Sequence, residues 1–534
     1  MTGYDVDVLV VGAGPVGLMA ASQLAHSGVS VRLVDAAAGP ATTSRALGAH
    51  ARSLEIYDQL GIVGEIAPHG TRISTFVRHQ GGRGMRLDFD FAGLPTRFPY
   101  MFNIDQVIIE RVLRGAAASA GVAVEWNTRL ESFQHDDDAV TAVLRGGDGS
   151  GAAHETVRAR YLWGCDGGHS TVRKTLRLPL TGESAHTWLI ADAIVHTDVD
   201  RDGVHWLFPP GGALMLFPFP EPGKWRLLDT TGEGRPEDPE QIARQFGAKL
   251  SRALERDTVV ENPTWASKFT IQQRAVPAMH VGRCFVSGDA AHVHSPASGQ
   301  GLNTGVQDAY NLAWKLAMVI HGQADATLLD TYDAERVPIG RALLASTSEV
   351  MGTVMVDTAG GGTPESPESM REFQHQLIRS MSGLAIAYPD SPLTVPDDEP
   401  GEGPRPGERL TQISAADAQS PGWTILRAEL RSPAWHLLHF TGSEKAAGQD
   451  HLTSGTGALP AWVDTVTISH ERPGDGHGVW DPDGRVHDTL AATAGDWILV
   501  RPDGYLSARG TGGTSLRAAL NRLTSLRKPE PTRA

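Results

Sequence analysis

The chain has 534 residues, which is too long for one ordinary hydrophobic core and predicts two to four domains. Its formal net charge of −15 argues against a nucleic-acid partner, and no apolar run approaches the roughly 18 residues that a membrane span needs. The two cysteines, Cys165 and Cys284, form no CxxC pair, so neither a zinc site nor a dithiol pair is indicated and we expect no metal. The N-terminus shows no signal-peptide pattern, so we expect a cytoplasmic protein.

The first 35 residues show a strand, a turn, a helix and a second strand in that order. An apolar run at 8–11 leads into GAGPVG at 12–17, then a helical pattern, then an apolar run at 29–34 that ends at Asp35. A GxGxxG motif alone is weak, but here it has a strand before it, a helix after it and an acid about 20 residues on. The stretch therefore predicts a dinucleotide site, with an ordinary tight turn as the alternative.

Each residue of this turn has a physical role in such a site. Gly12 allows the tight turn, Gly14 lets the backbone approach a pyrophosphate, and Gly17 lets helix and strand pack closely. The helix that begins at Pro15–Val16 presents free N–H groups to the phosphates, and Asp35 can accept a hydrogen bond from a ribose hydroxyl.

Polar residues at the starts of the next two predicted helices are further candidates. Arg45 and Arg52 flank the entry to a helix predicted over 51–60, where they can reach a pyrophosphate or a flavin edge. For Arg52 a solvated helix face is an equal alternative. Gln106 opens a helix predicted over 105–120.

Two acidic residues, Asp166 and Asp289, each follow an apolar strand. Asp166 can contact bridging water or a nicotinamide cofactor, or simply belong to a β-turn. Asp289 can hold a ribityl hydroxyl, and its alternative is a capping role in a strand-to-helix turn. The amides of 299–303 precede a helix predicted from Thr304 to His321, and such donors suit the flavin N1–C2=O edge.

The rest of the chain divides into regions of different composition. From 179 to about 270, alternating strands separated by Pro/Gly turns predict an antiparallel sheet inserted into the nucleotide domain. A Pro/Gly/acid linker at 395–406 precedes a mixed region of strands and helices. GxGxxG occurs once in the chain, which favours one tightly bound flavin and a nicotinamide cofactor that visits a surface cleft.

Three motifs together resemble the group A flavoprotein monooxygenases, which have the para-hydroxybenzoate hydroxylase-like fold. They are GAGPVG with Asp35, Cys165-Asp166-Gly167 with Arg173, and GDAAHVHSPASGQGLNTGVQDAYNLAWKL from residue 288. SRALGAHARSLEIYDQLGIV from residue 44 is similar to the aromatic polyketide hydroxylases and rifampicin monooxygenase of this family. LVRPDGYLSARG from residue 499 is similar to the thioredoxin-like domain of larger members.

The resemblance implies an α/β fold of three domains. A Rossmann-type FAD-binding domain is expected at 1–178 and 271–395, with an inserted antiparallel β-sheet substrate domain at 179–270. A thioredoxin-like domain is expected at 407–534, where the absence of cysteine excludes thiol chemistry and leaves a structural or dimerisation role.

The resemblance also implies roles for single residues around FAD. The glycines of the first motif hold the pyrophosphate, Asp35 the adenosine ribose, and Asp289 the ribityl chain. Arg45 and Pro296 are expected to act by positioning, with Pro296 beside the reactive flavin face. The remaining residues of the expected FAD site are Gln106, Leu130, Asp166, Gly299, Gly301, Leu302 and Asn303.

The substrate cavity is expected between the inserted sheet and the flavin. Its candidate lining residues are His205, Trp206, Phe208, Phe217, Phe219 and Arg226, although most aromatic side chains in strands belong to the core. His50, His292 and His294 are candidate polar neighbours, for which a structural hydrogen bond is favoured over base catalysis.

The activity implied by the family is oxygen insertion from O₂ into a polycyclic aromatic, polyketide-type substrate, through a C4a-hydroperoxide of FAD. NADPH or NADH serves as a transient reductant, and the context is natural-product biosynthesis by a monomer or homodimer. Baeyer–Villiger insertion or ring rearrangement uses the same scaffold and remains open at this point. A flavin protein that no longer oxygenates and a simple oxidase are the alternatives from other classes.

Overall fold

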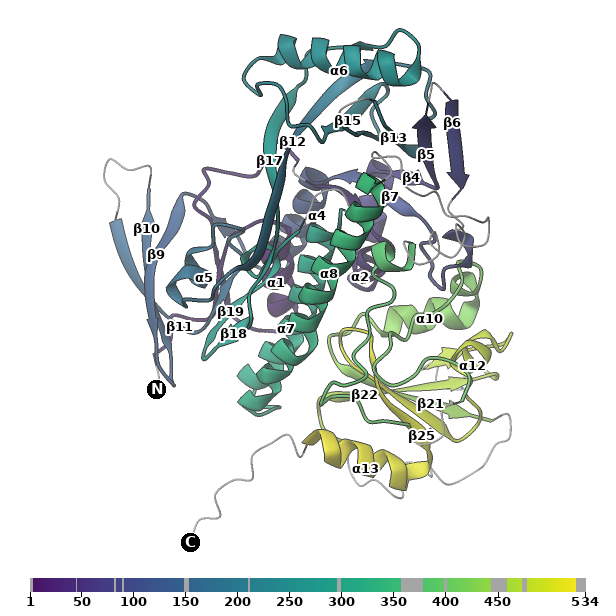
Figure 1. Cartoon of the computed structure of the whole chain (residues 1–534). Coiled ribbons are helices and arrows are strands. Elements are labelled where there is room, and N and C mark those ends of the chain that lie inside the picture. Colours follow the sequence, from purple (N-terminus) through teal and green to yellow (C-terminus); the bar gives the residue numbers. More distant parts are fainter. Residues whose placement is uncertain are drawn as a thin grey trace.

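The computed structural model describes residues 3–44, 46–80, 83–88, 91–147, 153–209, 212–294, 299–356, 378–397, 401–442, 459–472 and 478–524. Figure 1 shows a central body around the long helices α7 (Gln300–Ile320) and α8 (Asp330–Val356), an upper sheet beneath α6 (Pro239–Leu254) and a lower sheet beside α13 (Gly512–Thr524). Within these residues, no helix combines the length and the apolar character needed to cross a membrane.

The N-terminal apolar runs form the buried centre of a mostly parallel sheet. β1 (Val6–Val11) pairs in parallel with β2 (Val31–Val34) and with β11 (Ala153–Gly164), and β11 pairs in parallel with β19 (Cys284–Val286). Both faces of such a sheet are covered, which explains why its strands are apolar runs rather than alternating ones. The predicted Rossmann-type sheet is confirmed. It is completed by β8 (Val124–Glu125), β9 (Thr128–His135), β10 (Val140–Gly146) and β18 (His280–Val281).

The helices of the central body pack beside this sheet. α1 (Pro15–His26) lies against α7, which begins at Gln300, earlier than the Thr304 predicted from the sequence. The earlier start follows from Gly299, whose φ of 61° lets it cap the helix. The other elements are α2 (Ala51–Gln59), α3 (Val63–Ile66), α4 (Gln106–Ser119), α5 (Thr171–Thr175) and the small sheet of β3 (Leu47–Ala49), β4 (Thr71–Ile73) and β7 (Met101–Asp105).

The upper sheet is largely antiparallel, as the inserted region predicted. Its centre is β12 (Thr181–His196), which pairs with β15 (Lys224–Asp229) and β17 (Trp265–Ala275). The hairpin of β5 (Thr75–Gln80) and β6 (Arg83–Asp88) joins the same sheet through a parallel pairing with β13 (Gly203–Leu207). The domain limits of 179–270 stay a prediction. The sheet also includes the β5–β6 hairpin, which precedes these limits in the chain. Its other strands are β14 (Leu214–Pro218), β16 (Val259–Val260) and β20 (His292–Val293).

The C-terminal region forms a separate sheet with its own core. Its strand order is β23 (Val479–Trp480), β22 (Val463–Ser469), β21 (Trp435–Thr441), β24 (Asp496–Val500) and β25 (Leu506–Thr511). β23, β22 and β21 pair in parallel, whereas β24 pairs antiparallel with both β21 and β25. α10 (Pro421–Glu429) and α12 (Arg485–Leu490) pack against it with α13.

A buried group of charges joins this region to α7 and α8. Arg501 binds Glu335 of α8 through two nitrogens at 2.6 and 2.9 Å and also binds Asp503 at 2.6 Å, and Lys315 of α7 binds Glu335 at 2.7 Å. All four side chains are almost completely buried. Burial lowers the pKa of Lys315 to about 8. For Glu335, burial would raise the pKa, but Arg501 and Lys315 bring it below its ordinary value.

Removing the shared anion should therefore weaken the whole fold. We expect Glu335→Gln to destabilise the protein by about 3–5 kcal/mol, because Arg501 and Lys315 would lose the charge that compensates their burial. The thermal unfolding midpoint measures the effect. Glu261→Gln is the matched control, since Glu261 forms an exposed pair with His196 and should change stability by less than about 0.5 kcal/mol. Equal midpoints for the two variants would contradict this account.

Candidate active site

The Gly-rich turn has the shape that a pyrophosphate requires. Gly12 has a φ of 102°, and a Cβ on it would lie 2.4 Å from the Cys165 carbonyl oxygen. A Cβ on Gly17 would lie 1.8 Å from the carbonyl oxygen of Gly12, so this helix start can approach the strand only as glycine. A Cβ on Gly14 would meet no atom within 4 Å, which leaves open space above the start of α1. The turn therefore fits the phosphate group of FAD.

Asp35 closes the turn from the end of β2. One carboxylate oxygen accepts from the Ala13 backbone N–H at 2.6 Å, and the other accepts from the Ala37 N–H at 2.7 Å. A carboxylate has about four lone-pair positions, so the same group can still accept from a ribose hydroxyl.

Three further predicted residues, Gln106, Leu130 and Asp166, make contacts within the protein itself. The Gln106 side chain accepts from the Ala46 N–H at 3.0 Å, and so holds the chain next to Arg45. Leu130 is 3% exposed and belongs to the core. Asp166 accepts from the Ser170 hydroxyl and from the N–H groups at the start of α5, an arrangement that favours the turn alternative. Burial nevertheless raises the pKa of Asp166.

Val16 connects the first motif to the second. Its Cγ2 would lie 2.9 Å from a Cβ on Gly288 and 2.6 Å from a Cβ on Gly305, so both positions leave room only for a glycine. Because of this fit, the start of α1 lies against the turn before Asp289 and against α7. Two motifs far apart in the chain thus become neighbours.

Asp289 faces the first turn of α7. Its side chain is exposed, whereas Gly288 and Ala290 on either side are buried. A Cβ on Gly301 would lie 3.8 Å from Asp289 Oδ1. The carboxylate is therefore placed at the surface beside the helix start, where an acid that binds a ribityl hydroxyl is expected.

Asn303 shapes the loops around this helix start. Its amide nitrogen donates to the backbone oxygens of Gly299 at 2.7 Å and Gly48 at 3.2 Å, and its amide oxygen accepts from the His50 N–H at 2.8 Å. The Gly299 cap has no side-chain hydrogen bond, so the N–H groups at Gly301 and Leu302 carry the positive end of a 21-residue helix. Such donors suit an electron-rich flavin edge. Arg45 and Pro296 lie outside the described residues, and their roles stay predictions.

The neighbouring histidines form a buried network rather than a free base. His292 binds Asp308 at 2.7 Å and His294 at 2.8 Å, and Arg336 binds the other oxygen of Asp308 at 2.7 Å. Burial would raise the pKa of Asp308, but His292 and Arg336 hold it at about 2. Burial and the nearby His292 lower the pKa of His294 well below its ordinary value. These contacts favour the structural role expected for both histidines.

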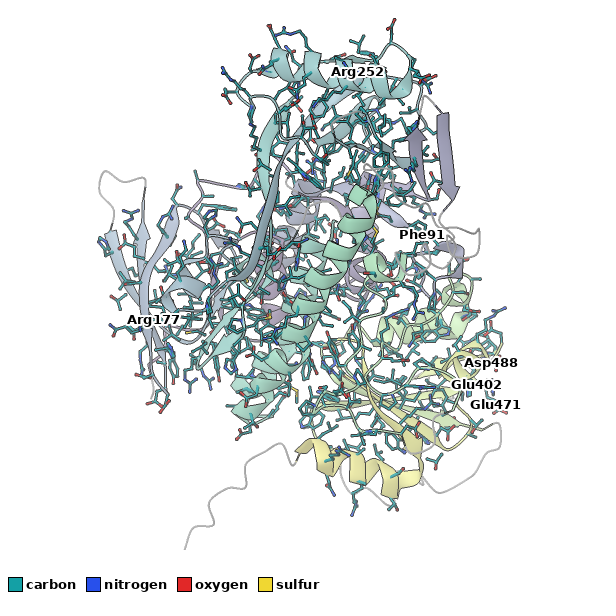
Figure 2. The ribbon with its side chains drawn as sticks, in the orientation of Figure 1. Phe91, Arg177, Arg252, Glu402, Glu471 and Asp488 are labelled. Carbon is teal, nitrogen blue, oxygen red and sulfur yellow. The ribbon has the colours of Figure 1, made fainter. Side chains whose placement is uncertain are left out.

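The predicted substrate residues divide between the two faces of the upper sheet. Trp206 and Phe217 face the central body, where they pack with residues of β5 and β7. His205 lies on the opposite face, beneath α6, and bonds His79 at 2.9 Å and the Asp200 carbonyl at 2.6 Å. In Figure 2, Arg252 marks α6, which lies on the side of the upper sheet away from the central body. His205 is thus separated from Trp206 because neighbouring residues of a strand point to opposite faces.

Arg226 connects the sheet to the loop before Arg45. It binds Asp192 through two nitrogens at 2.8 Å and donates to the Ser44 carbonyl at 2.8 Å. Asp192, which the sequence analysis did not select, pairs with Arg226 across β12 and β15. Phe219 is 1% exposed beneath Arg226, so it is a core residue, while Phe208 is half-buried beside Arg78.

A cavity adjoins the start of α7. Its volume is about 640 Å³, and its described lining comes from α7, α8 and the segment 379–389, including Asn303 and Met381, with His50 from the start of α2. This volume is within the range of small-molecule sites. The segment 379–389 carries no sequence motif, and its place beside Asn303 depends on tertiary packing alone.

Comparison with known proteins identifies the family. Residues 5–347, more than half of the chain, match the family of the FAD binding domain. The chain belongs to the group A flavoprotein monooxygenases and is an FAD-dependent monooxygenase.

Individual relatives make the resemblance more specific. The chain is 43% identical to 6-methylpretetramide 4-monooxygenase of Streptomyces rimosus, over 98% of this chain and 94% of that protein. It is 35% identical to rifampicin monooxygenase of Rhodococcus hoagii, over 96% and 97%. The solved ternary complex of aklavinone-11 hydroxylase with FAD and aklavinone matches with a TM-score of 0.73 at 26% identity, over 98% of this chain and 100% of that one.

The close packing of Gly17 is testable. Gly17→Ala should destabilise the protein by at least about 1–3 kcal/mol, because the new Cβ meets the Gly12 carbonyl oxygen. Gly115→Ala in α4 is the control: no atom lies within 4 Å of its Cβ, and we expect a gain of about 0.5–1 kcal/mol. Urea unfolding measures both, and an unchanged midpoint for Gly17→Ala would rule out the packing role.

The role of Asp289 is also testable. We propose that the exposed Asp289 carboxylate holds the ribityl chain, so Asp289→Ala should purify with little flavin. Asp257→Ala is the control, since Asp257 is also exposed but lies in the turn after α6. Absorbance of the purified proteins near the flavin band gives the FAD content per chain. A fully loaded Asp289→Ala protein would remove this residue from the site.

Proposed function

We propose that the protein is an NAD(P)H-consuming monooxygenase that inserts one oxygen atom of O₂ into a polycyclic aromatic, polyketide-type substrate in natural-product biosynthesis. The observation that carries the proposal is the position of Asp289. Its exposed carboxylate faces the first turn of α7, and a cavity of about 640 Å³ adjoins that same turn. This arrangement supports a cofactor and a ring-shaped substrate beside one helix start.

The relatives support this substrate class. The protein with 43% identity is named for a 4-monooxygenation of 6-methylpretetramide, and a 32% identical relative is named for oxygenation of 12-dehydrotetracycline and anhydrotetracycline. The structural neighbour with a TM-score of 0.73 was solved with FAD and aklavinone. Because these alignments cover nearly the whole chain, they support a substrate of similar size and ring chemistry here.

Binding of the cofactor is assigned to two helix starts. Gly14 and the N–H groups of α1 would hold the pyrophosphate of FAD, Asp35 the ribose and Asp289 the ribityl chain. The N–H groups of Gly301 and Leu302 would offer donors to an electron-rich flavin edge. When bound and reduced by NADPH or NADH, FAD supplies the activation of O₂.

The substrate is oriented by the sheet and the cavity lining. Trp206 and Phe217 offer aromatic surface toward the central body, and such surface excludes water while it contacts a ring system. The ion pair of Arg226 with Asp192 fixes the loop at Ser44, which leads into the expected cofactor contact at Arg45. The buried network ties His292 and His294, which follow Asp289, to Asp308 of α7, and we assign it a structural role.

Isotope labelling tests the proposal directly. With ¹⁸O₂ and a panel of polyphenolic polyketides, we expect one ¹⁸O atom in the product and equal consumption of NAD(P)H and O₂. The same reaction in H₂¹⁸O under ordinary O₂ is the control and should leave the new oxygen unlabelled. A product oxidised without a nicotinamide cofactor would indicate an oxidase instead. A labelled lactone rather than a labelled phenol would replace hydroxylation by Baeyer–Villiger insertion.

A further inference from the structure

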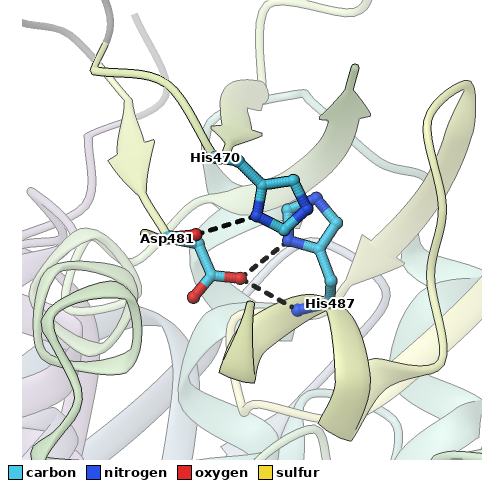
Figure 3. A group of neighbouring side chains, drawn as sticks. All are labelled: His470, Asp481 and His487. Atoms are coloured by element: carbon cyan, nitrogen blue, oxygen red, sulfur yellow. Dashed lines mark hydrogen bonds and ion pairs between the residues drawn. The ribbon is translucent and has the colours of Figure 1, made fainter. Parts of the chain in front are cut away.

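Two histidines and an aspartate form a cluster at one edge of the C-terminal sheet. His470 directly follows β22 and Asp481 directly follows β23, and the residues before them, Ser469 and Trp480, are paired in the parallel register. His487 reaches the same place from α12 (Figure 3). The carboxyl edge of parallel strands is where open α/β sheets bind ligands.

Hydrogen bonds to Asp481 set the proton positions on both rings. His487 Nδ1 lies 2.7 Å from the Asp481 carboxylate, and His470 Nδ1 lies 3.0 Å from the Asp481 backbone oxygen. Both oxygens are acceptors, so each neutral ring carries its proton on Nδ1 and its lone pair on Nε2. This arrangement, with a carboxylate or carbonyl behind the imidazole, is the one that orients metal-binding histidines.

The lone pair of His487 is buried without a partner. Among the described residues, no group bonds its Nε2, and the side chain is only 9% exposed. The exposed His470 ring covers it, with ring centroids 4.0 Å apart and an angle of 21° between the planes. Figure 3 shows the second nitrogens of the two rings at the same end of the stack. A buried polar atom left unpaired costs stability unless a ligand uses it.

We propose that His470 and His487 bind a divalent transition-metal ion such as Zn²⁺ through their Nε2 atoms, with Asp481 as the residue that orients His487. Imidazole nitrogen is a preferred ligand of Zn²⁺, Cu²⁺ and Ni²⁺. One donor atom of each of the three residues lies within 4.8 Å of the other two. Zinc binds nitrogen at about 2.0–2.1 Å, and the lone pairs of two stacked rings point side by side, so the exposed His470 ring must turn out of the stack before both nitrogens can bind one ion. Water completes the coordination.

The alternative is a purely structural role for the cluster. Asp481 also accepts from the backbone N–H groups of Val486 and His487, and so caps α12. A Cβ on Gly422 would lie 2.5 Å from Asp481 Oδ1, so the packing around the carboxylate is tight. A capping role explains the position of Asp481 and the hydrogen bond between Asp481 and His487 Nδ1. It explains neither the unpaired Nε2 of His487 nor the second histidine stacked over it. The site involves no cysteine, so the cysteine count of the chain gives no signal for it.

The test uses the full-length, tag-free holoprotein after treatment with a chelator. Zn²⁺ binding is measured by calorimetry, and Cu²⁺ is used as a spectroscopic probe because its EPR spectrum reports nitrogen ligands. His487→Asn keeps an N–H donor toward Asp481 but lacks the Nε2 atom, and His470→Ala removes the exposed ligand. His436→Asn is the matched control: His436 is buried in the same sheet, and its Nδ1 also has no described partner, but it belongs to no cluster.

We expect the wild type and His436→Asn to bind one Zn²⁺ per chain and to show a Cu²⁺ spectrum with two nitrogen ligands. Each of the two site variants should bind at least about ten-fold more weakly while keeping the same FAD content. The proposal is overturned if the wild type binds no Zn²⁺ or if both site variants bind it as tightly as the wild type. If His487→Asn fails to fold, His470→Ala decides alone, because its side chain is exposed.

Discussion

The flavin site depends on how closely α1 packs against α7. Val16 occupies a space that exists only because Gly288 and Gly305 have no side chains, and Gly17 approaches the Gly12 carbonyl in the same way. About 270 residues separate the first motif from Asp289 in the chain, and this contact brings them together. A larger side chain at any of these glycines would move the two helix starts apart. The phosphate end and the ring end of the cofactor would then no longer share one site.

The C-terminal region is also linked to α7, by a network of buried charges. The first turn of α7 faces Asp289, while Lys315 further along binds Glu335, which in turn binds Arg501 of the C-terminal region. Because these charges are buried, the network is stable only when it is complete. The C-terminal region therefore holds α7 in position by packing and charge, and without cysteine it has no thiol chemistry. The proposed metal site lies in the same region, at the carboxyl ends of β22 and β23.

Local pattern predicted the steric features of the Gly-rich turn. The close approaches at Gly12 and Gly17 and the open space at Gly14 could be read from the sequence because a turn between a strand and a helix imposes its own steric demands. Sequence spacing was less informative about Asp166, because its carboxylate accepts hydrogen bonds from the start of α5. The same holds for His205, which strand alternation turns away from Trp206 toward α6. Asp192 could have been found as an acid in an apolar strand, a position that calls for a buried partner such as Arg226.

The sequence by itself determined the class of cofactor, the order of the elements and the residues at each turn, because these follow from neighbours a few positions apart. Tertiary structure decided which distant groups meet: the β5–β6 hairpin beside β13, the segment 379–389 beside Asn303, and His470 beside His487. Such contacts depend on strand register and helix packing across the whole chain, and a single sequence carries no local signal for them. The opening motif therefore identified the cofactor, and the fold supplied the cavity beside the start of α7.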